Sequence, residues 1–204
     1  MGIGTILFDF GGVVAEEGFW EGLREIGRKN GLDPDDFFSS ADRLINESRY
    51  LTGGASESDY WQALRRTTGI AGSDNDLRKE ILSRFALRRE VLACVDLFRM
   101  KGFRVYLLSD QTNWLEEIDR ESALYSHFDG VFNSFRTHLS KRNEGTFSAV
   151  CDELGIRPED ALFIDDNAGH VERAVRSRLH AILYTSMQDF SRRLQLLTGI
   201  ECGG

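Results

Sequence analysis

The sequence predicts an α/β protein: a doubly wound, Rossmann-like parallel sheet with a helical cap inserted after the first strand. Five short apolar runs alternate with amphipathic segments, which is the order of elements in a parallel α/β sheet. The runs are apolar at consecutive positions, as strands covered on both faces are. One long interval breaks the alternation. We therefore expect an α/β core of residues 1–14 and 90–204 and a helical cap of residues 15–89.

The five apolar runs are the predicted strands. They are "TILFDF" (5–10), "RVYLLSD" (104–110), "DGVFNS" (129–134), "ALFIDDN" (161–167) and "HAILYT" (180–185). Helical periodicity covers 89–102 before the second run, 143–155 before the fourth and 169–178 after it.

The interval 15–89 carries start signals for helices and no convincing strand. Pro34 in "LDPDDFF" suits a first helical position, and Ser56 is followed three residues later by Asp59, as in a capping box. The interval is several times longer than an ordinary crossover. We expect a helical subdomain over one edge of the sheet.

Composition limits the classes of function. A chain of 204 residues with 41% hydrophobic side chains can bury one full core, or a core and a small satellite. The net charge of -8 argues against a surface dedicated to nucleic acid or anionic lipid, so we expect neither as a partner. Three scattered cysteines have no metal-ligand spacing, and no apolar run reaches the roughly 18 residues of a membrane span. We expect a cytoplasmic protein.

Polar and acidic residues follow three of the five predicted strands. They are Asp9, then Ser109 with Asp110, then Asp165 with Asp166. A single aspartate at a strand end is more often a turn or cap residue than a functional one. Open parallel sheets, however, bind ligands beyond the carboxyl ends of their strands. Three such sets at equivalent ends therefore favour a site.

These features resemble the haloacid dehalogenase-like (HAD) hydrolases, in the phosphatase-like branch with a helical cap after the first motif. The resemblance covers most of the chain and rests on four motifs in order, "DFGGV", "YLLSD", "LSKRNEGTF" and "FIDDN". It implies a Mg²⁺-dependent phosphatase that hydrolyses a small phosphorylated metabolite, sugar phosphates included, through an aspartyl-phosphate intermediate.

The resemblance implies that Asp9 is the nucleophile, since a carboxylate can accept a phosphoryl group as a mixed anhydride. Asp9, the backbone carbonyl of Gly11 and Asp166 would bind Mg²⁺, whose preferred ligands are hard oxygens. Asp165 would lie beside them and orient Lys141 or a water. Which of the two neighbouring aspartates contacts the metal directly stays open.

The phosphate would be bound by the second and third motifs. Ser109 and the backbone amide of Asp110 would donate hydrogen bonds to its oxygens, and Lys141 would add positive charge. Taken alone, Lys141 would be read as a solvated lysine. Its place between the second and fourth motifs supports the functional assignment.

Two positions depart from the family pattern. Arg142 follows Lys141 where relatives usually carry proline, and Gly11 stands where phosphatases usually carry an aspartate that acts as acid and base. That role contributes about 10² to 10⁴ in rate. The candidates for it elsewhere in the sequence are Asp110, His138 and His170.

Two alternatives to a phosphatase follow from the sequence. Gly11 and the altered lysine motif motivate a catalytically weak or inactive binding module. The family name also suggests a metal-free haloacid dehalogenase, but such members lack the paired acids of "FIDDN".

The cap is expected to select the substrate. In "SRYLTGG" (48–54), Arg49 and Tyr50 are candidate substrate contacts, although a solvated arginine and a packed tyrosine are equally compatible with the pattern. Phe19 and Trp20 begin a helix whose apolar positions continue to Ile26, so we expect them in the core.

Overall fold

A computed structural model describes residues 2–202 and contains one five-stranded sheet. The strands are β1 (Thr5–Phe8), β2 (Arg104–Ser109), β3 (Gly130–Asn133), β4 (Ala161–Asp165) and β5 (His180–Leu183). All neighbouring pairs are parallel, in the order β3-β2-β1-β4-β5. The chain thus winds outward from β1 in both directions. The predicted doubly wound sheet is confirmed, and each of the five apolar runs contains one of its strands.

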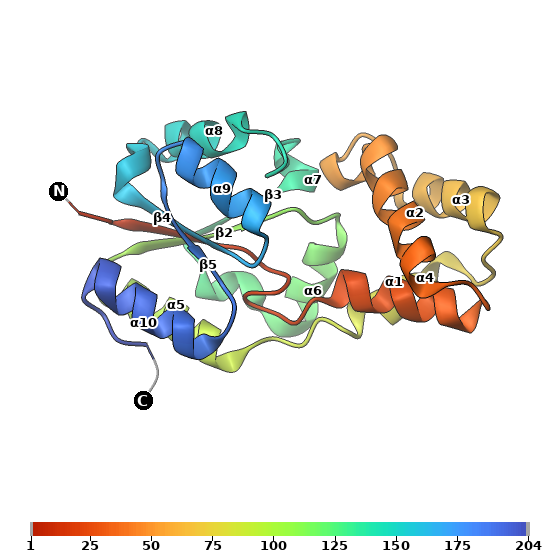
Figure 1. The fold of residues 1–204 in the computed structure, drawn as a ribbon, viewed down its shortest axis with the longest axis horizontal. Helices are drawn as coiled ribbons and strands as arrows, with labels where there is room; N and C mark the ends of the chain where they lie inside the picture. The colour runs from red at the N-terminus through yellow and green to blue at the C-terminus, as the bar shows by residue number, and fades with distance from the viewer. Residues whose placement is uncertain (1, 203–204) are drawn as a thin grey trace.

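Helices cover both faces of this sheet (Figure 1). Helices α5 (Arg89–Met100), α6 (Trp114–Ser122) and α10 (Met187–Thr198) pack on one face, and α8 (Gly145–Leu154) and α9 (Ala168–Arg176) on the other. Ile6 and Phe8 of β1 join the first hydrophobic cluster and Leu7 joins the second, all with no exposed surface. Burial on both faces explains why this strand is apolar at consecutive positions.

The short elements lie between the main ones. They are α7 (Ser134–Thr137) and the 3₁₀ helices η1 (Tyr50–Thr52), η2 (Leu124–His127) and η3 (Pro158–Asp160).

The cap consists of α1 (Gly18–Lys29), α2 (Pro34–Glu47), α3 (Glu57–Thr68) and α4 (Asp74–Leu82), on the right of Figure 1. Helix α2 begins at Pro34, and Ser56 and Asp59 form a reciprocal capping box at α3, as the sequence predicted. The main sheet takes no strand from residues 15–89, all of which the structure describes. The helical insertion after β1 is therefore confirmed.

Two chain segments, 14–17 and 85–88, join the cap to the core; we call them the hinge. They run antiparallel at Ala15 and Leu87, and the amide of Arg88 donates to the carbonyl of Val14 at 2.8 Å. The side chains of Glu16 and Arg88 form an ion pair across the hinge, also at 2.8 Å. The start of the cap is thereby fixed next to the end of β1.

Among residues 2–202, no helix is both long and apolar enough to cross a bilayer.

Candidate active site

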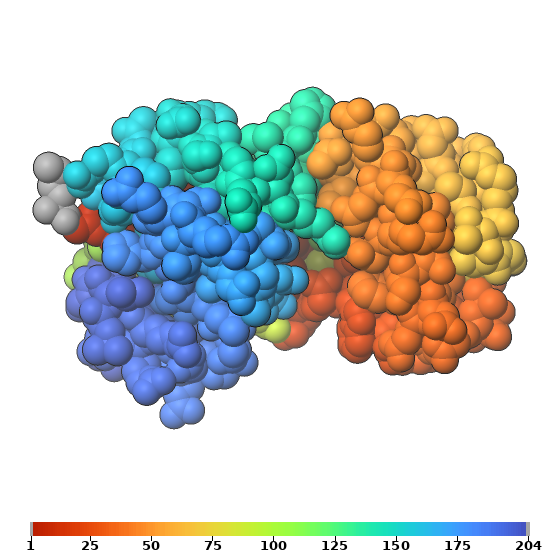
Figure 2. All heavy atoms as spheres, turned by 45° about the horizontal axis from the view of Figure 1, so that its top comes forward, coloured from red at the N-terminus to blue at the C-terminus, as the bar shows by residue number. Residues whose placement is uncertain are grey.

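A cavity of about 320 Å³ lies between the carboxyl ends of the central strands and the cap. Figure 2 shows the hollow between the core, in blue and cyan, and the cap, in orange. Its lining on the core side is Asp9, Gly11, Ser109, Asp110, Gln111, Thr112, Lys141, Arg142, Asp165, Asp166, Asn167 and His170. Its lining on the cap side is Glu17, Phe19, Trp20, Phe38, Asp42, Ile45 and Leu51. The predicted site residues of all four motifs therefore share one cavity.

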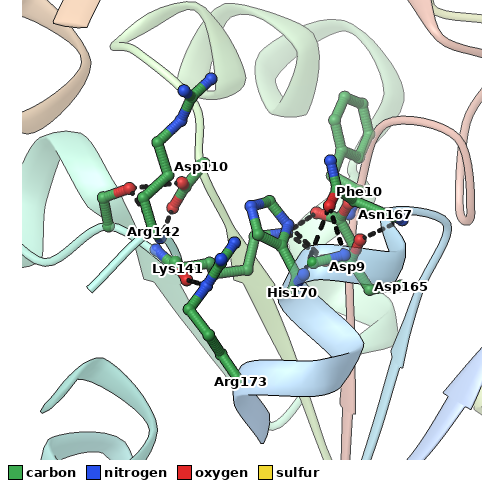
Figure 3. Close-up of polar contacts among 11 residues, drawn as sticks. Asp9, Phe10, Asp110, Lys141, Arg142, Asp165, Asn167, His170 and Arg173 are labelled. Carbon is green, nitrogen blue, oxygen red and sulfur yellow. Dashed lines mark hydrogen bonds and ion pairs between the residues drawn. The ribbon is translucent and has the colours of Figure 1, made fainter. Parts of the chain in front are cut away.

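Lys141 is the centre of the polar cluster in this cavity. Its side chain is 1% exposed, and its Nζ lies 2.6 Å from Asp9 Oδ1 and 2.6 Å from Asp165 Oδ2 (Figure 3). The amide of Phe10 donates a further hydrogen bond to Asp9 Oδ1 at 2.7 Å. The lysine is thus a buried counter-ion of two aspartates, and not a solvated surface residue.

The ammonium group of Lys141 faces the buried carboxylates of Asp9 and Asp165. The pKa shifts of the three residues follow from this excess of carboxylates over ammonium groups. Burial alone would raise the pKa of Asp165, but the attraction of Lys141 and a hydrogen bond from His170 lower it to about 2. Burial and repulsion by Asp165 raise the pKa of Asp9 well above its usual range, against the opposing effect of Lys141. Burial would lower the pKa of Lys141, yet the two aspartates outweigh it and raise this pKa. The lysine therefore stays charged.

Asp166 adds a third carboxylate to the cluster. One oxygen each of Asp9, Asp165 and Asp166 can lie within 4.8 Å of the others. Burial and repulsion by Asp165 raise the pKa of Asp166. Three carboxylates against one ammonium leave excess negative charge, and hard carboxylate oxygens at this spacing suit Mg²⁺. The donor set fits a divalent cation.

The glycine after Gly11 makes room for this third carboxylate. Gly12 has φ of 81°, a left-handed conformation that side chains rarely adopt, and a Cβ there would overlap the carboxylate of Asp166. Position 12 therefore requires glycine, both for its backbone conformation and because Asp166 leaves no room for a side chain.

The loop after β4 holds Asp165 by both oxygens. The amide of Asn167 donates to Asp165 Oδ1 at 2.7 Å, and Nδ1 of His170 lies 3.1 Å from Oδ2. The Asn167 side chain caps α9 by accepting from the amides of Gly169 and His170, at 2.9 and 3.2 Å. Asn167, the N-cap of α9, thus also places His170 against Asp165.

Asp110 has a structural task that the sequence did not indicate. Its Oδ1 accepts from the amide of Lys141 at 2.9 Å, and its Oδ2 accepts from the hydroxyl of Ser140 at 2.6 Å. Arg173 donates to the carbonyl of Lys141 at 2.8 Å. These contacts fix the loop that carries the lysine. Ser109, at the end of β2, is 2% exposed and lines the cavity.

Arg142 joins the core to the cap. Its guanidinium lies 3.0 Å from a carboxylate oxygen of Asp42 on α2, and both residues line the cavity. An ion pair therefore connects the loop of Lys141 to the cap across the cavity.

Glu17 occupies the space beside Gly11, and sequence reasoning missed it. A Cβ built on Gly11 would lie 2.7 Å from Glu17 Oε2, and Gly11 itself is outside the left-handed region. Burial raises the pKa of Glu17, with repulsion from Asp166 adding to it. The one local signal was a glutamate at the start of a helix, where shorter Ser, Thr, Asp and Asn are preferred.

The two residues of the expected specificity loop lie away from the cavity. Tyr50 has no exposed surface, stacks on Tyr60 at 5.5 Å between ring centroids, and donates its hydroxyl to Asn113 Oδ1 at 2.6 Å. Arg49 is exposed and adopts a left-handed φ of 63° before η1. The cavity lining includes neither residue. The structure favours the alternative interpretation, a packed tyrosine and a solvated arginine.

Two expected core residues instead line the cavity. The side chain of Phe19 is half-buried and contacts Trp114 and Phe38, while Trp20 is 37% exposed. The buried face of α1 continues through Leu23 and Ile26, one and two turns further along the helix. The expectation of a core position was wrong for Trp20, which is exposed at the cavity, while Phe19 packs against the hydrophobic core and lines the cavity as well.

Comparisons with known proteins agree with this fold. A HAD family enzyme of Bacteroides thetaiotaomicron superposes with a TM-score of 0.78 at 21% identity, covering 95% of this chain and 99% of that one. The same enzyme has been solved in complex with magnesium and inorganic phosphate, with a TM-score of 0.75. A HAD-like family hydrolase of Porphyromonas gingivalis gives 0.77 at 24% identity, covering 96% and 99% of the two chains.

Curated relatives match over part of their length. Bifunctional epoxide hydrolase 2 of Sus scrofa is 21% identical over 223 residues, which cover 98% of this chain and 40% of the relative. The chain thus spans well under half of that protein. The model of the haloacid dehalogenase-like hydrolases matches residues 3–175. The chain belongs to the haloacid dehalogenase-like hydrolase family.

Proposed function

We propose that the chain is a Mg²⁺-dependent phosphatase that hydrolyses a small phosphorylated metabolite through a phosphoryl group carried on Asp9. The observation that carries this proposal is the convergence of Asp9, Asp165 and Asp166 around a single buried lysine. Their excess negative charge suits a divalent cation, and a structural relative was solved with magnesium and phosphate.

The metal ligands we propose are Asp9, Asp166 and the backbone carbonyl of Gly11. Both oxygens of Asp165 already accept hydrogen bonds, so we assign it to orienting Lys141 and His170. When bound, the ion would offset the negative charge of an incoming phosphate.

Asp9 is the proposed nucleophile. Its carboxylate oxygen forms a bond to phosphorus as the ester bond to the leaving oxygen breaks, and water later releases inorganic phosphate and restores the carboxylate. We assign binding of the phosphate oxygens to Lys141, the hydroxyl of Ser109 and the amide of Asp110, because all three residues line the cavity.

The cavity supports a small substrate. Its volume, about 320 Å³, is at the low end of ligand pockets, which hold roughly 300 to 1,000 Å³. Phe19, Trp20 and Phe38 give the cap side an aromatic surface, and Asp42 and Arg142 add polar groups. A sugar phosphate, with an apolar ring face and hydroxyl groups, is one substrate of this kind.

The test is turnover of a panel of phosphorylated metabolites with Mg²⁺ and with EDTA, by wild type, Asp9→Asn and Asp152→Asn. Asp152 is exposed on α8 outside the cavity, so Asp152→Asn is the matched control: it makes the same chemical change as Asp9→Asn away from the site. We expect Mg²⁺-dependent phosphate release by wild type and Asp152→Asn and background release by Asp9→Asn.

Other outcomes identify the alternatives. Chloride release from chloroacetate without metal would establish the dehalogenase. Binding of Mg²⁺ in calorimetry with no turnover of any ester would establish the binding module that Gly11 motivates.

A further inference from the structure

Gly11 leaves the proposed reaction without the usual proton donor, and the candidates named from the sequence are engaged elsewhere. His138 Nδ1 lies 2.7 Å from the carbonyl of Thr52, and this histidine is not among the cavity residues. Both oxygens of Asp110 hold the loop of Lys141.

His170 does line the cavity, but its Nδ1 contacts Asp165 at 3.1 Å. This contact ties His170 to Asp165, the carboxylate that also pairs with Lys141.

Glu17 is the carboxyl group that lies where the missing side chain would be. Its Oε2 is 2.7 Å from the position of a Cβ on Gly11, with Phe85 Cε1 at 3.5 Å from the same point. A side chain at position 11 and the carboxyl group of Glu17 therefore compete for one space, in the lining of the cavity that also contains Asp9.

The orientation of this carboxyl group is fixed by the fold. Glu17 Oε1 accepts a hydrogen bond from the amide of Trp20 at 3.2 Å, which caps α1. A shorter residue would cap the helix at least as well. The length of glutamate places the second oxygen, Oε2, against Gly11.

We propose that Glu17 is the general acid and base of the phosphatase, in place of the aspartate that Gly11 replaces. The inference rests on the proposed function. In the first half-reaction an oxygen of Asp9 bonds to phosphorus, the bond from phosphorus to the leaving oxygen breaks, and the Glu17 carboxyl proton passes to that oxygen. In the second, the Glu17 carboxylate takes a proton from water, the water oxygen bonds to phosphorus, and the bond to Asp9 breaks.

This assignment makes the cap part of the catalytic machinery. Glu17 belongs to the hinge, where the amide of Glu16 donates to the carbonyl of Ala86 at 2.9 Å, so movement of the cap would move the proton donor.

The test is Glu17→Gln, which keeps an acceptor for the Trp20 amide and removes the proton. Turnover is measured with Mg²⁺ on p-nitrophenyl phosphate, phenyl phosphate and glycerol 3-phosphate, whose leaving groups become steadily poorer. We expect a loss of about 10² to 10⁴ on the alkyl ester and a much smaller loss on the nitrophenyl ester, because a good leaving group needs no proton. Glu21→Gln, an exposed residue on the same helix, is the matched control and should keep wild-type rates.

A second pair of variants uses the competition for space. Gly11→Asp alone places its Cβ against Glu17 Oε2, whereas Gly11→Asp with Glu17→Ala frees that space. We expect the double variant to exceed Glu17→Ala at least tenfold on glycerol 3-phosphate. If Glu17→Gln fails to fold, Glu17→Asp is the second variant. Aspartate can still cap the N-terminus of α1, but its shorter side chain moves the carboxyl group away from Gly11. This variant should show the same dependence on leaving group.

An equal loss on all three esters, or no loss, contradicts the role of Glu17 while wild-type turnover still supports a phosphatase. No turnover of any ester by wild type overturns the proposed function, and the inference with it.

Discussion

Replacing Lys141 with methionine should destabilise the protein strongly. The change keeps most of the length and volume of the side chain but removes the charge that lies 2.6 Å from both Asp9 and Asp165. Asp165 has no exposed side-chain surface, so water cannot compensate for the loss. Removing one partner of a buried ion pair costs about 3 to 5 kcal/mol. At 2 to 4 °C per kcal/mol, that is a fall in Tm of roughly 6 to 20 °C.

The deficit should depend on pH with a definite sign. Without Lys141, burial raises the pKa of both aspartates above their unfolded values near 3.9. The folded variant then binds more protons than the unfolded chain, so its stability falls as pH rises. In wild type, Asp165 has a pKa of about 2 and contributes stability above pH ~3.9 that is lost as pH falls toward 2. The loss in Lys141→Met should therefore be larger at pH 8 than at pH 5.

The assay is thermal and urea unfolding of both proteins in EDTA and in Mg²⁺. Lys101→Met is the matched control: Lys101 is exposed after α5, and surface substitutions usually cost within about 0.5 kcal/mol. Mg²⁺ should recover part of the loss, because a divalent cation offsets the same carboxylates. A fall in free energy of unfolding below about 1 kcal/mol, with no change between pH 5 and pH 8, would refute the reasoning.

Gly12→Ala should lower the free energy of unfolding more than Gly31→Ala and should weaken Mg²⁺ binding in calorimetry. Both glycines have positive φ, but only Gly12 faces a carboxylate. Equal losses of stability with unchanged Mg²⁺ binding would contradict this. Glu17→Gln should gain stability relative to wild type in EDTA as pH rises from about 4 to about 8, since burial raises the pKa of Glu17 and makes its ionised form costly. A difference independent of pH in urea unfolding would count against it. Arg142→Ala should lower stability by less than about 1 kcal/mol, because its ion pair with Asp42 is partly exposed, and should raise KM more than it lowers kcat. A larger effect on kcat in steady-state assays would show that the ion pair acts on the chemical step.

The sheet and the three acidic strand ends could be predicted because both follow from local sequence. Consecutive apolar residues mark a strand buried on both faces, and the parallel sheet brings Asp9, Ser109 and Asp165 to one edge. The prediction that Lys141 belongs to the site depended on the family resemblance, since nothing in the neighbouring sequence distinguishes it from a surface lysine.

The remaining features depend on contacts between segments distant in sequence. Tyr50 is buried because Trp114 of α6 packs on it at 5.8 Å between centroids, and α6 was not among the predicted helices. Phe19 of the cap lies near Trp114 of the core, at 6.5 Å between ring centroids, where it also lines the cavity. Glu17 is only six residues from Gly11, but the approach of its Oε2 to Gly11 depends on the path of the chain between them, which no sequence pattern indicated.

The helix α10 was also not predicted. It packs Phe190 against Phe8 of β1, at 6.0 Å between ring centroids. Phe190 and Leu194 are the buried residues of α10, so this helix contributes to the core through tertiary contacts.

The most direct test of the account is to locate the phosphoryl group during turnover. Wild type is mixed with Mg²⁺ and a substrate found in the panel, quenched in acid within one turnover, digested and analysed by mass spectrometry. We predict one added phosphoryl group on the peptide that contains Asp9, and none in Asp9→Asn. Active wild-type protein that carries the group on another residue, or on no residue at any quench time, would contradict the assignment of Asp9 as the nucleophile.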